Sequence, residues 1–136
     1  MTPDISSRAD IDALMLSFYQ RAMQDPLIGR IFTDVARLDL AHHLPVIGDF
    51  WESTLFGTGR YSRHDRNPLL IHEELDRRSA LEATHFDRWL ELFVATVDES
   101  FSGRRAEYAK QRGHAIAARM QQFLGERRAG ARAIQA

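Results

Sequence analysis

Residues 85–101 read His-Phe-Asp-Arg-Trp-Leu-Glu-Leu-Phe-Val-Ala-Thr-Val-Asp-Glu-Ser-Phe, and this stretch decides the fold class. Its large apolar side chains recur at steps of three and four: Phe86, Trp89, Leu90, Phe93, Val97 and Phe101. That period is typical of an amphipathic helix with a broad buried face. Gly103 follows at a position where helices commonly end. The pattern therefore predicts a long helix that carries aromatic side chains into the core.

The same period extends outward in both directions along the chain. It predicts helices over residues 8–24, 40–56 and 104–124. Residues 57–67 contain two glycines and a polar cluster, which predict a loop, and Pro68 is a favoured first residue for a short helix. No segment shows sustained alternation of period two, so we expect no sheet. The fold class that follows is all-α.

Length and composition place the chain among ordinary globular proteins. It has 136 residues, of which 44% are hydrophobic and 27% charged, so one domain with a real core is expected. We assign residues 1–124 to that domain and residues 125–136, which lack an apolar face, to a flexible C-terminal tail. A formal net charge of -1 gives no global field toward nucleic acid or an anionic membrane.

Several kinds of chemistry and targeting are excluded by residue type. The chain has no cysteine, so disulfides, thiolate metal sites and cysteine nucleophiles are ruled out. The first residues lack a basic region followed by an apolar stretch, and no apolar run is long enough to span a membrane. We therefore expect a cytoplasmic protein that binds neither membrane nor nucleic acid.

Two histidines stand in apolar helical contexts and are the strongest candidates for chemistry. His72 ends the run Pro68-Leu-Leu-Ile-His72, and His43 shares a predicted helix face with Ile47 and Phe50. Neutral imidazole is a common metal ligand, and a haem iron needs an axial nitrogen on a rigid element in an apolar slot. Either side chain could equally be a structural histidine, bonded to a carbonyl or partly exposed. Residue spacing alone favours that structural role for each.

Tyr19 and Trp89 lie on inward stripes and each carry a hydrogen-bond donor. Either could donate to a bound ligand or be an ordinary core residue. A di-iron carboxylate site is disfavoured, because Glu82 and His85 form the Glu-x-x-His pattern only once. The zinc-protease pattern His-Glu-x-x-His is absent, since no second histidine follows His72-Glu73 at the required spacing.

Taken together, short motifs from about Ile11 to Phe123 resemble the third group of truncated haemoglobins. They stand in a specific order and spacing: Phe18-Tyr19, Ile31-Phe32, the run from His43 to Gly57, Pro68-Leu-Leu-Ile-His72, the run from His85 to Phe93 and Asp98-Glu-Ser-Phe-Ser-Gly103. The chain also lacks the paired-glycine motifs that mark the first two truncated groups.

The resemblance implies a two-over-two helical sandwich around haem b. It implies that His72 is the proximal iron ligand and that Tyr19 and Trp89 are distal donors to a bound ligand. His43 becomes a distal histidine. The haem and pocket walls that it implies are Phe32, Ile47, Phe50 and Trp89.

The chain departs from the family between Tyr61 and Pro68. The family pattern there is Tyr-x-Gly-x-Pro, whereas this chain has about three more residues and no glycine. The longer loop places Arg63, His64 and Arg66 where they could reach a haem propionate, because charge-assisted pairing with a carboxylate is favourable.

Our leading hypothesis is a globin that reversibly binds O2, and also NO or CO, at a pentacoordinate haem iron. Donors in a dry pocket would slow release, which suits NO or peroxide detoxification better than oxygen transport. The resemblance does not decide between ligand binding alone and enzymatic turnover. We expect a monomer that depends on a reductase of unknown identity. The rival hypotheses are a cofactor-free helical interaction domain and a non-haem metal protein.

Overall fold

The computed structural model describes residues 2–135, and within them every regular element is helical. The elements are α1 (Arg8–Gln24), the π-helix η1 (Ile31–Val35), α2 (Leu40–Phe56), the 3-10 helix η2 (Arg60–His64), α3 (Pro68–Arg78), α4 (Ala83–Ser100) and α5 (Arg104–Gln135). The predicted helices 8–24 and 40–56 agree with α1 and α2. The prediction of an all-α protein is confirmed.

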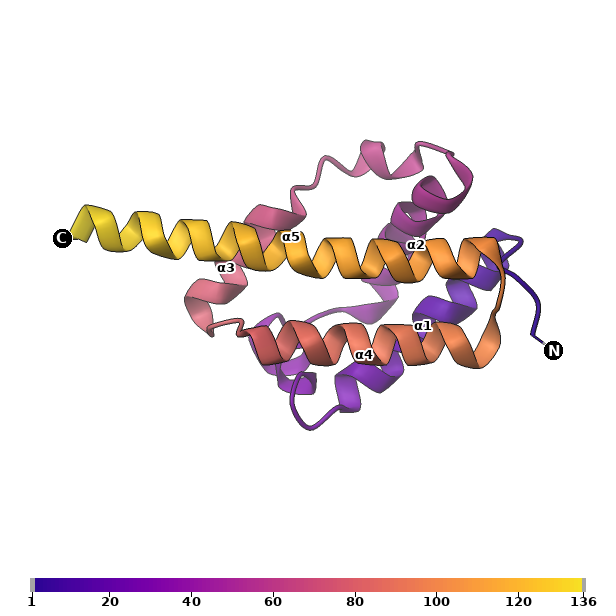
Figure 1. Cartoon of the computed structure of the whole chain (residues 1–136), viewed down its shortest axis with the longest axis horizontal. Coiled ribbons are helices and arrows are strands. Elements are labelled where there is room, and N and C mark those ends of the chain that lie inside the picture. The colour runs from indigo at the N-terminus through magenta and orange to yellow at the C-terminus, as the bar shows by residue number, and fades with distance from the viewer. Residues whose placement is uncertain (1, 136) are drawn as a thin grey trace.

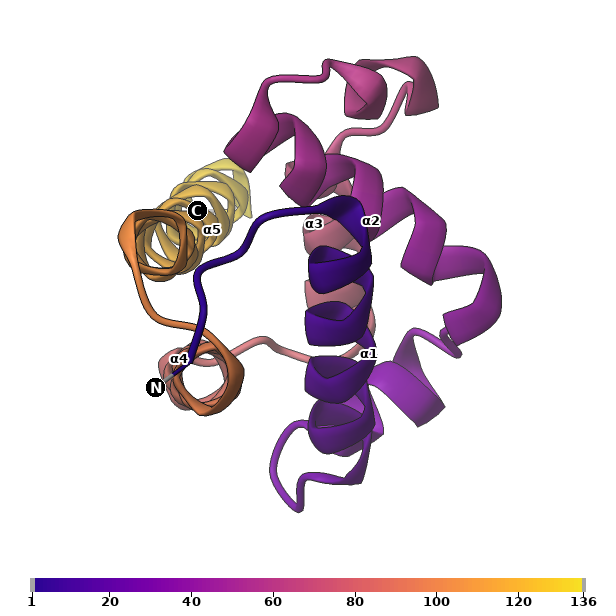
Figure 2. The same cartoon turned by 90° about the vertical axis from the view of Figure 1, so that its right-hand side faces the viewer.

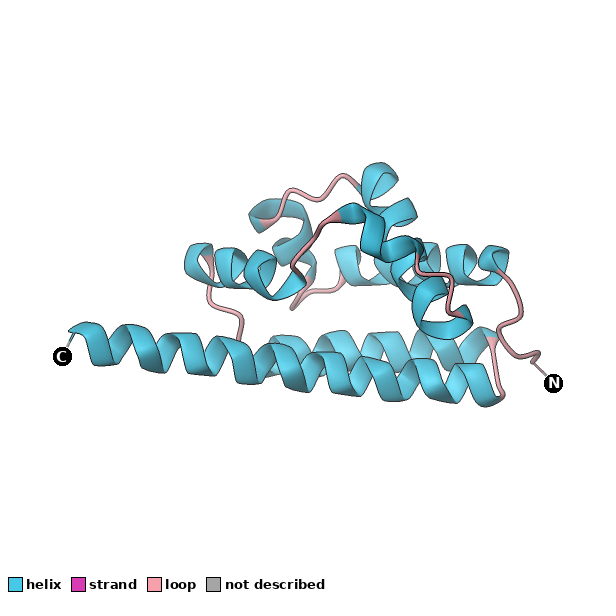
Figure 3. Ribbon diagram, turned by 90° about the horizontal axis from the view of Figure 1, so that it is seen from above, coloured by secondary structure: helices cyan, strands magenta, loops and turns pink. Residues whose placement is uncertain are grey.

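The helices form two layers. In Figure 1, α4 and α5 run side by side in front of α1 and α2. The end-on view of Figure 2 shows α4 and α5 as one layer and α1 crossing them steeply in the other. Figure 3 shows the same two layers from above. Because α1 contacts α2 and α4, and α4 contacts α5, the arrangement is the predicted two-over-two sandwich.

Short polar residues begin three of the helices. The side chains of Ser7, Asp39 and Asn67 each accept a hydrogen bond from a backbone N–H three residues later. Such caps satisfy donors that have no partner inside the helix. At the other end of α2, Gly57 has φ +69°, a left-handed conformation that glycine adopts without strain. Local sequence therefore explains where these elements start and stop.

Phe93 lies at the centre of the core. Its ring stacks on Trp51 from α2 and Trp89 from α4, with centroids 5.1 and 5.5 Å away, and meets Phe18 from α1 edge-on at 5.6 Å. Only 1% of Phe93 is exposed. The Cβ of any larger residue at Gly113 on α5 would come within 3.0 Å of the same ring. One side chain thus connects both layers.

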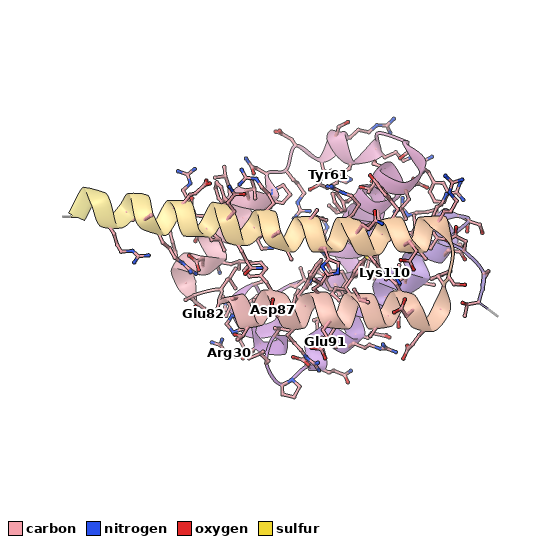
Figure 4. All side chains as sticks on the ribbon, in the orientation of Figure 1. Arg30, Tyr61, Glu82, Asp87, Glu91 and Lys110 are labelled. Carbon is pink, nitrogen blue, oxygen red and sulfur yellow. The ribbon has the colours of Figure 1, made fainter. Side chains whose placement is uncertain are left out.

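The segment before α1 caps the start of α5. The carboxylate of Asp4 accepts hydrogen bonds from the backbone N–H groups of Arg105 and Ala106 at 3.0 and 2.9 Å. A negative charge at that position also complements the helix dipole. Lys110, labelled on α5 in Figure 4, bridges to Asp98 on α4 at 2.7 Å. The Asp4 contacts fix the N-terminal segment to the start of α5, and the Lys110–Asp98 pair links α5 to α4.

A polar network attaches η2 to α2. The Arg8 guanidinium lies so close to Gly48 that an added Cβ would meet it at 2.6 Å, and it donates to Asp49 at 2.7 Å. Arg60 pairs with the buried Glu52 at 2.8 Å, and the His64 Nε2 atom lies 2.7 Å from Asp49. The expected loop 57–67 is therefore partly ordered.

One predicted boundary is wrong. We expected the last helix to end near residue 124, but α5 continues to Gln135. Residues past 124 lack an apolar stripe, which is why the pattern ended the helix early. They are held instead by charge, because Arg127 pairs with Glu73 and Arg128 with Asp76 on α3. The separation of residues 1–124 from a tail 125–136 stays a prediction.

Replacement of Phe93 by alanine should lower the free energy of unfolding by about 3–5 kcal/mol, because it removes a buried aromatic ring and leaves a cavity. Urea unfolding followed by circular dichroism measures this loss. Tyr108→Ala is the control, since Tyr108 is 46% exposed and should change stability by about 0.5 kcal/mol or less. A loss below about 1 kcal/mol in Phe93→Ala would contradict its central position.

Candidate functional site

A cavity of about 600 Å³ opens between the two helical layers. That volume is within the range of roughly 300–1,000 Å³ typical of small-molecule sites. Its walls are mainly apolar. Seven side chains singled out from the sequence all line it: Tyr19, Phe32, His43, Ile47, Phe50, His72 and Trp89. The structure therefore brings the predicted site residues together, while their roles stay predictions.

His72 reaches the cavity from the second turn of α3. Its Nδ1 atom lies 2.7 Å from the carbonyl oxygen of Pro68, so a neutral imidazole donates its proton there. Burial lowers the pKa of His72, and the hydrogen bond to Pro68 offsets this only in part. The neutral tautomer carries its lone pair on Nε2. A nitrogen prepared in this way can ligate a metal, and its orientation is set by the second nitrogen.

Tyr19 and His43 form a polar pair on another wall of the cavity. The Tyr19 hydroxyl lies 2.9 Å from His43 Nε2. Burial raises the pKa of the Tyr19 phenol above its usual range. Burial, with smaller contributions from the charges of Arg66 and His42, lowers the pKa of His43 to about 4. Both groups are therefore neutral near pH 7.

This neutral pair has two proton arrangements. Either the Tyr19 hydroxyl donates to His43 Nε2, or Nε2–H donates to the hydroxyl oxygen. In the second arrangement the hydroxyl proton is free to donate to a molecule in the cavity. His43 thus points toward the cavity wall shared with Tyr19 and can hold its hydroxyl in place. Their rings meet edge-on, with centroids 5.1 Å apart, which restricts rotation of both.

Trp89 provides the other donor of the cavity wall. Its ring is fixed between Phe93, stacked at 5.5 Å, and Phe18, edge-on at 5.8 Å. Within residues 2–135, the indole N–H of Trp89 has no hydrogen-bond partner. Because every fully buried polar side-chain atom in that range has a partner, this N–H is not fully buried. The N–H is thus available to a molecule in the cavity. Trp89 is both a structural residue and a candidate binding residue.

The predicted apolar wall residues occupy two sides of the cavity. Phe32, from η1, packs edge-on against Tyr19 with ring centroids 5.9 Å apart. Phe50, from α2, packs edge-on against Trp51 at 5.3 Å and Tyr61 at 5.1 Å. Ile47 lies one turn before Trp51 on the same helix. The rings of Phe32 and Phe50 and the side chain of Ile47 thus form apolar parts of the cavity wall.

The η2 segment and the loop before α3 contribute further residues to the cavity wall. Tyr61, labelled in Figure 4, lines the cavity and is the tyrosine that begins the family pattern, which was the signal available in the sequence. Of the three loop residues expected near a propionate, Arg66 lines the cavity, His64 instead contacts Asp49, and Arg63 is exposed. His85 lies in the first turn of α4, near the helix start as expected, and it also lines the cavity.

The described residues offer no multidentate site for a bare metal ion. Across residues 2–135, no group of three or more His, Cys, Asp or Glu side chains is close enough to hold one. A single imidazole is a weak site by itself, since protein-bound metals normally have three or four protein ligands.

Among the helices of the described part of the chain, we find none with the length and apolar content needed to cross a membrane.

Comparisons with known proteins agree with the geometry. A group 3 truncated haemoglobin of Campylobacter jejuni is 27% identical over 121 residues, which cover 87% of this chain and 91% of that protein. The crystal structure of a group III truncated haemoglobin from Campylobacter jejuni superposes with a TM-score of 0.77 at 28% identity, covering 91% of this chain and 95% of that one. No family model matches the chain. The resemblance predicted from the sequence is confirmed.

Acidification should destabilise the haem-free protein between about pH 6.5 and pH 4. His43 has a lower pKa in the folded state than in the unfolded chain, so the unfolded chain binds more protons in that window and stability rises with pH. The difference between a pKa of 6.5 in the unfolded chain and about 4 in the folded protein corresponds to a loss of about 3 kcal/mol at most in the free energy of unfolding. His72 contributes in the same direction.

Urea unfolding at pH 5 and pH 7 measures this slope, and His43→Phe should reduce it. His114→Gln is the matched control, because it also removes one histidine, yet His114 is exposed on α5 and does not line the cavity. It should leave the slope as in the wild type. Equal slopes for His43→Phe and the wild type would show that His43 is not buried as a neutral side chain.

Proposed function

We propose that this chain, which resembles the group III truncated haemoglobins in sequence and fold, binds haem b in the cavity between its helical layers. The observation that carries the proposal is the His72 side chain. Its Nδ1–H is engaged by Pro68 at 2.7 Å, so that Nε2 is the basic nitrogen presented by a residue of the cavity wall. This is the arrangement in which histidines ligate haem iron.

The remaining walls fit the same group. A porphyrin is a large apolar disc, and Phe32, Ile47, Phe50 and Trp89 present apolar surface to a cavity of about 600 Å³. A space of that size would be unfavourable in a packed core, because protein interiors contain few voids larger than a water molecule. A cavity of this size therefore disfavours a cofactor-free interaction domain. The cavity is more simply explained as the seat of a prosthetic group.

When bound, ferrous haem supplies an iron with an open coordination position for a diatomic molecule such as O2, NO or CO. The protein residues then decide how the ligand is held. Tyr19 and Trp89 are the donors on the cavity wall, and His43 keeps the Tyr19 hydroxyl oriented. Preorganised donors in a dry pocket stabilise negative charge that develops on a ligand. The site is therefore suited to retaining a polar ligand such as O2.

Slow ligand release fits turnover of the ligand better than its delivery. We propose reversible O2 binding as the basic activity and detoxification of NO or peroxide as its use. A reductase would be needed to keep the iron ferrous. That partner, a monomeric state and a cytoplasmic location stay predictions from the sequence.

Arg66 is suited to the carboxylates of the group. It lines the cavity and is partly buried, and its positive charge contributes to the pKa shifts of Tyr19, His43 and His72. A guanidinium favours carboxylate partners because it forms paired, charge-assisted hydrogen bonds. We propose that Arg66 holds a haem propionate, as the longer loop suggested.

Replacement of His72 by alanine should abolish the iron–histidine band and strongly weaken the Soret absorption of protein reconstituted with haem. His85→Ala is the matched control, since His85 also lines the cavity but its Nδ1 accepts from the Glu82 backbone N–H. Absorption and resonance Raman spectra of both variants provide the measurement. Stoichiometric haem binding with unchanged spectra in His72→Ala would overturn the assignment of His72.

Replacement of Tyr19 by phenylalanine should raise the O2 dissociation rate about tenfold or more, because a donor to a charged ligand is worth roughly 1.5–3 kcal/mol. Stopped-flow measurement of O2 release tests this. Tyr61→Phe is the control: its ring packs on Phe50 and should keep the wild-type rate. Unchanged rates in both Tyr19→Phe and Trp89→Phe would remove the distal donors from the account.

A further inference from the structure

The helix that carries His72 is short and depends on another element for its position. α3 has 11 residues, and Leu70 and Ile71 on it are exposed. A helix of this length is marginal in isolation, so packing against a neighbour must hold it. Within the described residues, α5 is the element that α3 packs against most extensively. Figures 1 and 3 show α3 beside the second half of α5.

Two arginines of α5 make the polar contacts between these helices. Arg127 Nε lies 3.0 Å from the Glu73 carboxylate. Arg128 binds Asp76 through two nitrogens, with its Nε 3.2 Å from Asp76 Oδ2. Glu73 is the residue after His72, and Asp76 lies one turn further along α3. Both ion pairs therefore act on the part of the helix that holds the imidazole.

The contacts are largely enclosed on the α3 side. The side chains of Glu73 and Asp76 are 14% and 12% exposed. Arg128 also donates to the Leu81 carbonyl at 2.9 Å, and Asp76 accepts from the Leu81 backbone N–H at 2.8 Å. One guanidinium thus joins the last turn of α3 to the connection that leads into α4. A lysine has no planar fork and cannot make the same set of contacts.

We propose that Arg127 and Arg128 are positioning residues for His72, acting through Glu73 and Asp76 to set the placement of α3 beside the cavity. This inference rests on the proposed haem function. It assigns a role to the segment that the sequence suggested was a tail. The imidazole is oriented locally by Pro68, while the helix beneath it is placed by the two arginines. Loss of either ion pair should change the strain on the iron–histidine bond.

The test compares wild-type protein with Arg127→Gln, Arg128→Gln, Arg128→Lys and Arg132→Gln, each reconstituted with haem. In the ferrous, ligand-free state we expect both glutamine variants at 127 and 128 to shift the iron–histidine stretching band. We also expect them to lose haem to a scavenger protein about three to ten times faster, below the larger effects seen for direct partners of metal ligands. Arg128→Lys should fall between Arg128→Gln and the wild type.

Arg132→Gln is the matched control, because it removes the same charge from the same helix. Arg132 is exposed, and its side chain donates to the Arg128 carbonyl at 3.5 Å. Its band and haem loss should equal those of the wild type. Wild-type behaviour in both Arg127→Gln and Arg128→Gln, or an equal shift in Arg132→Gln, would overturn the inference.

Two further outcomes are decisive. If Arg128→Gln loses its helical circular dichroism signal, Arg127→Gln alone tests the positioning role. Arg127 is 54% exposed, and its replacement removes a single ion pair. If wild-type protein shows no iron–histidine band, the proposed function fails, and this inference fails with it. If the wild type shows the band and the variants match it, only the positioning role fails.

Discussion

The packing of the Phe93 ring joins the two helical layers and fixes the position of the cavity between them. The ring contacts Trp51, Trp89 and Phe18, so three helices from both layers meet at one buried side chain. This aromatic cluster fills the core, and two of its members, Trp51 and Trp89, also line the cavity. The same interaction therefore holds the layers together and gives the cavity a rigid wall.

Three polar side chains of the cavity wall are held by specific neighbours. His72 is oriented by the Pro68 carbonyl, and Tyr19 is paired with His43. Burial keeps these side chains neutral near pH 7, which preserves a basic nitrogen on one residue and a donor on another. Neutral, preoriented groups in an apolar space suit an uncharged diatomic ligand that acquires polarity only on binding.

Helix limits that depend on an apolar stripe and a capping residue could be predicted from the sequence. Contacts between charged residues far apart in the chain could not. The stripes of α1 and α2 set their limits correctly, because burial of an apolar face and a capping residue define both helices. The end of α5 was missed because Arg128 finds Asp76 more than fifty residues earlier in the chain. Likewise Asp4 caps α5 from the opposite terminus. The seven site residues were named from the family resemblance and Arg66 from the longer loop, whereas the position of His85 on the cavity wall required the tertiary structure.

We propose that one haem occupies this cavity, and titration of the purified wild-type protein with haemin is the decisive measurement. We expect a Soret band that grows linearly and saturates at one equivalent per chain, with a rise in the unfolding temperature from ligand binding. A protein that stays colourless, gains no thermal stability and remains fully folded without haem would show that the cavity is not a haem site.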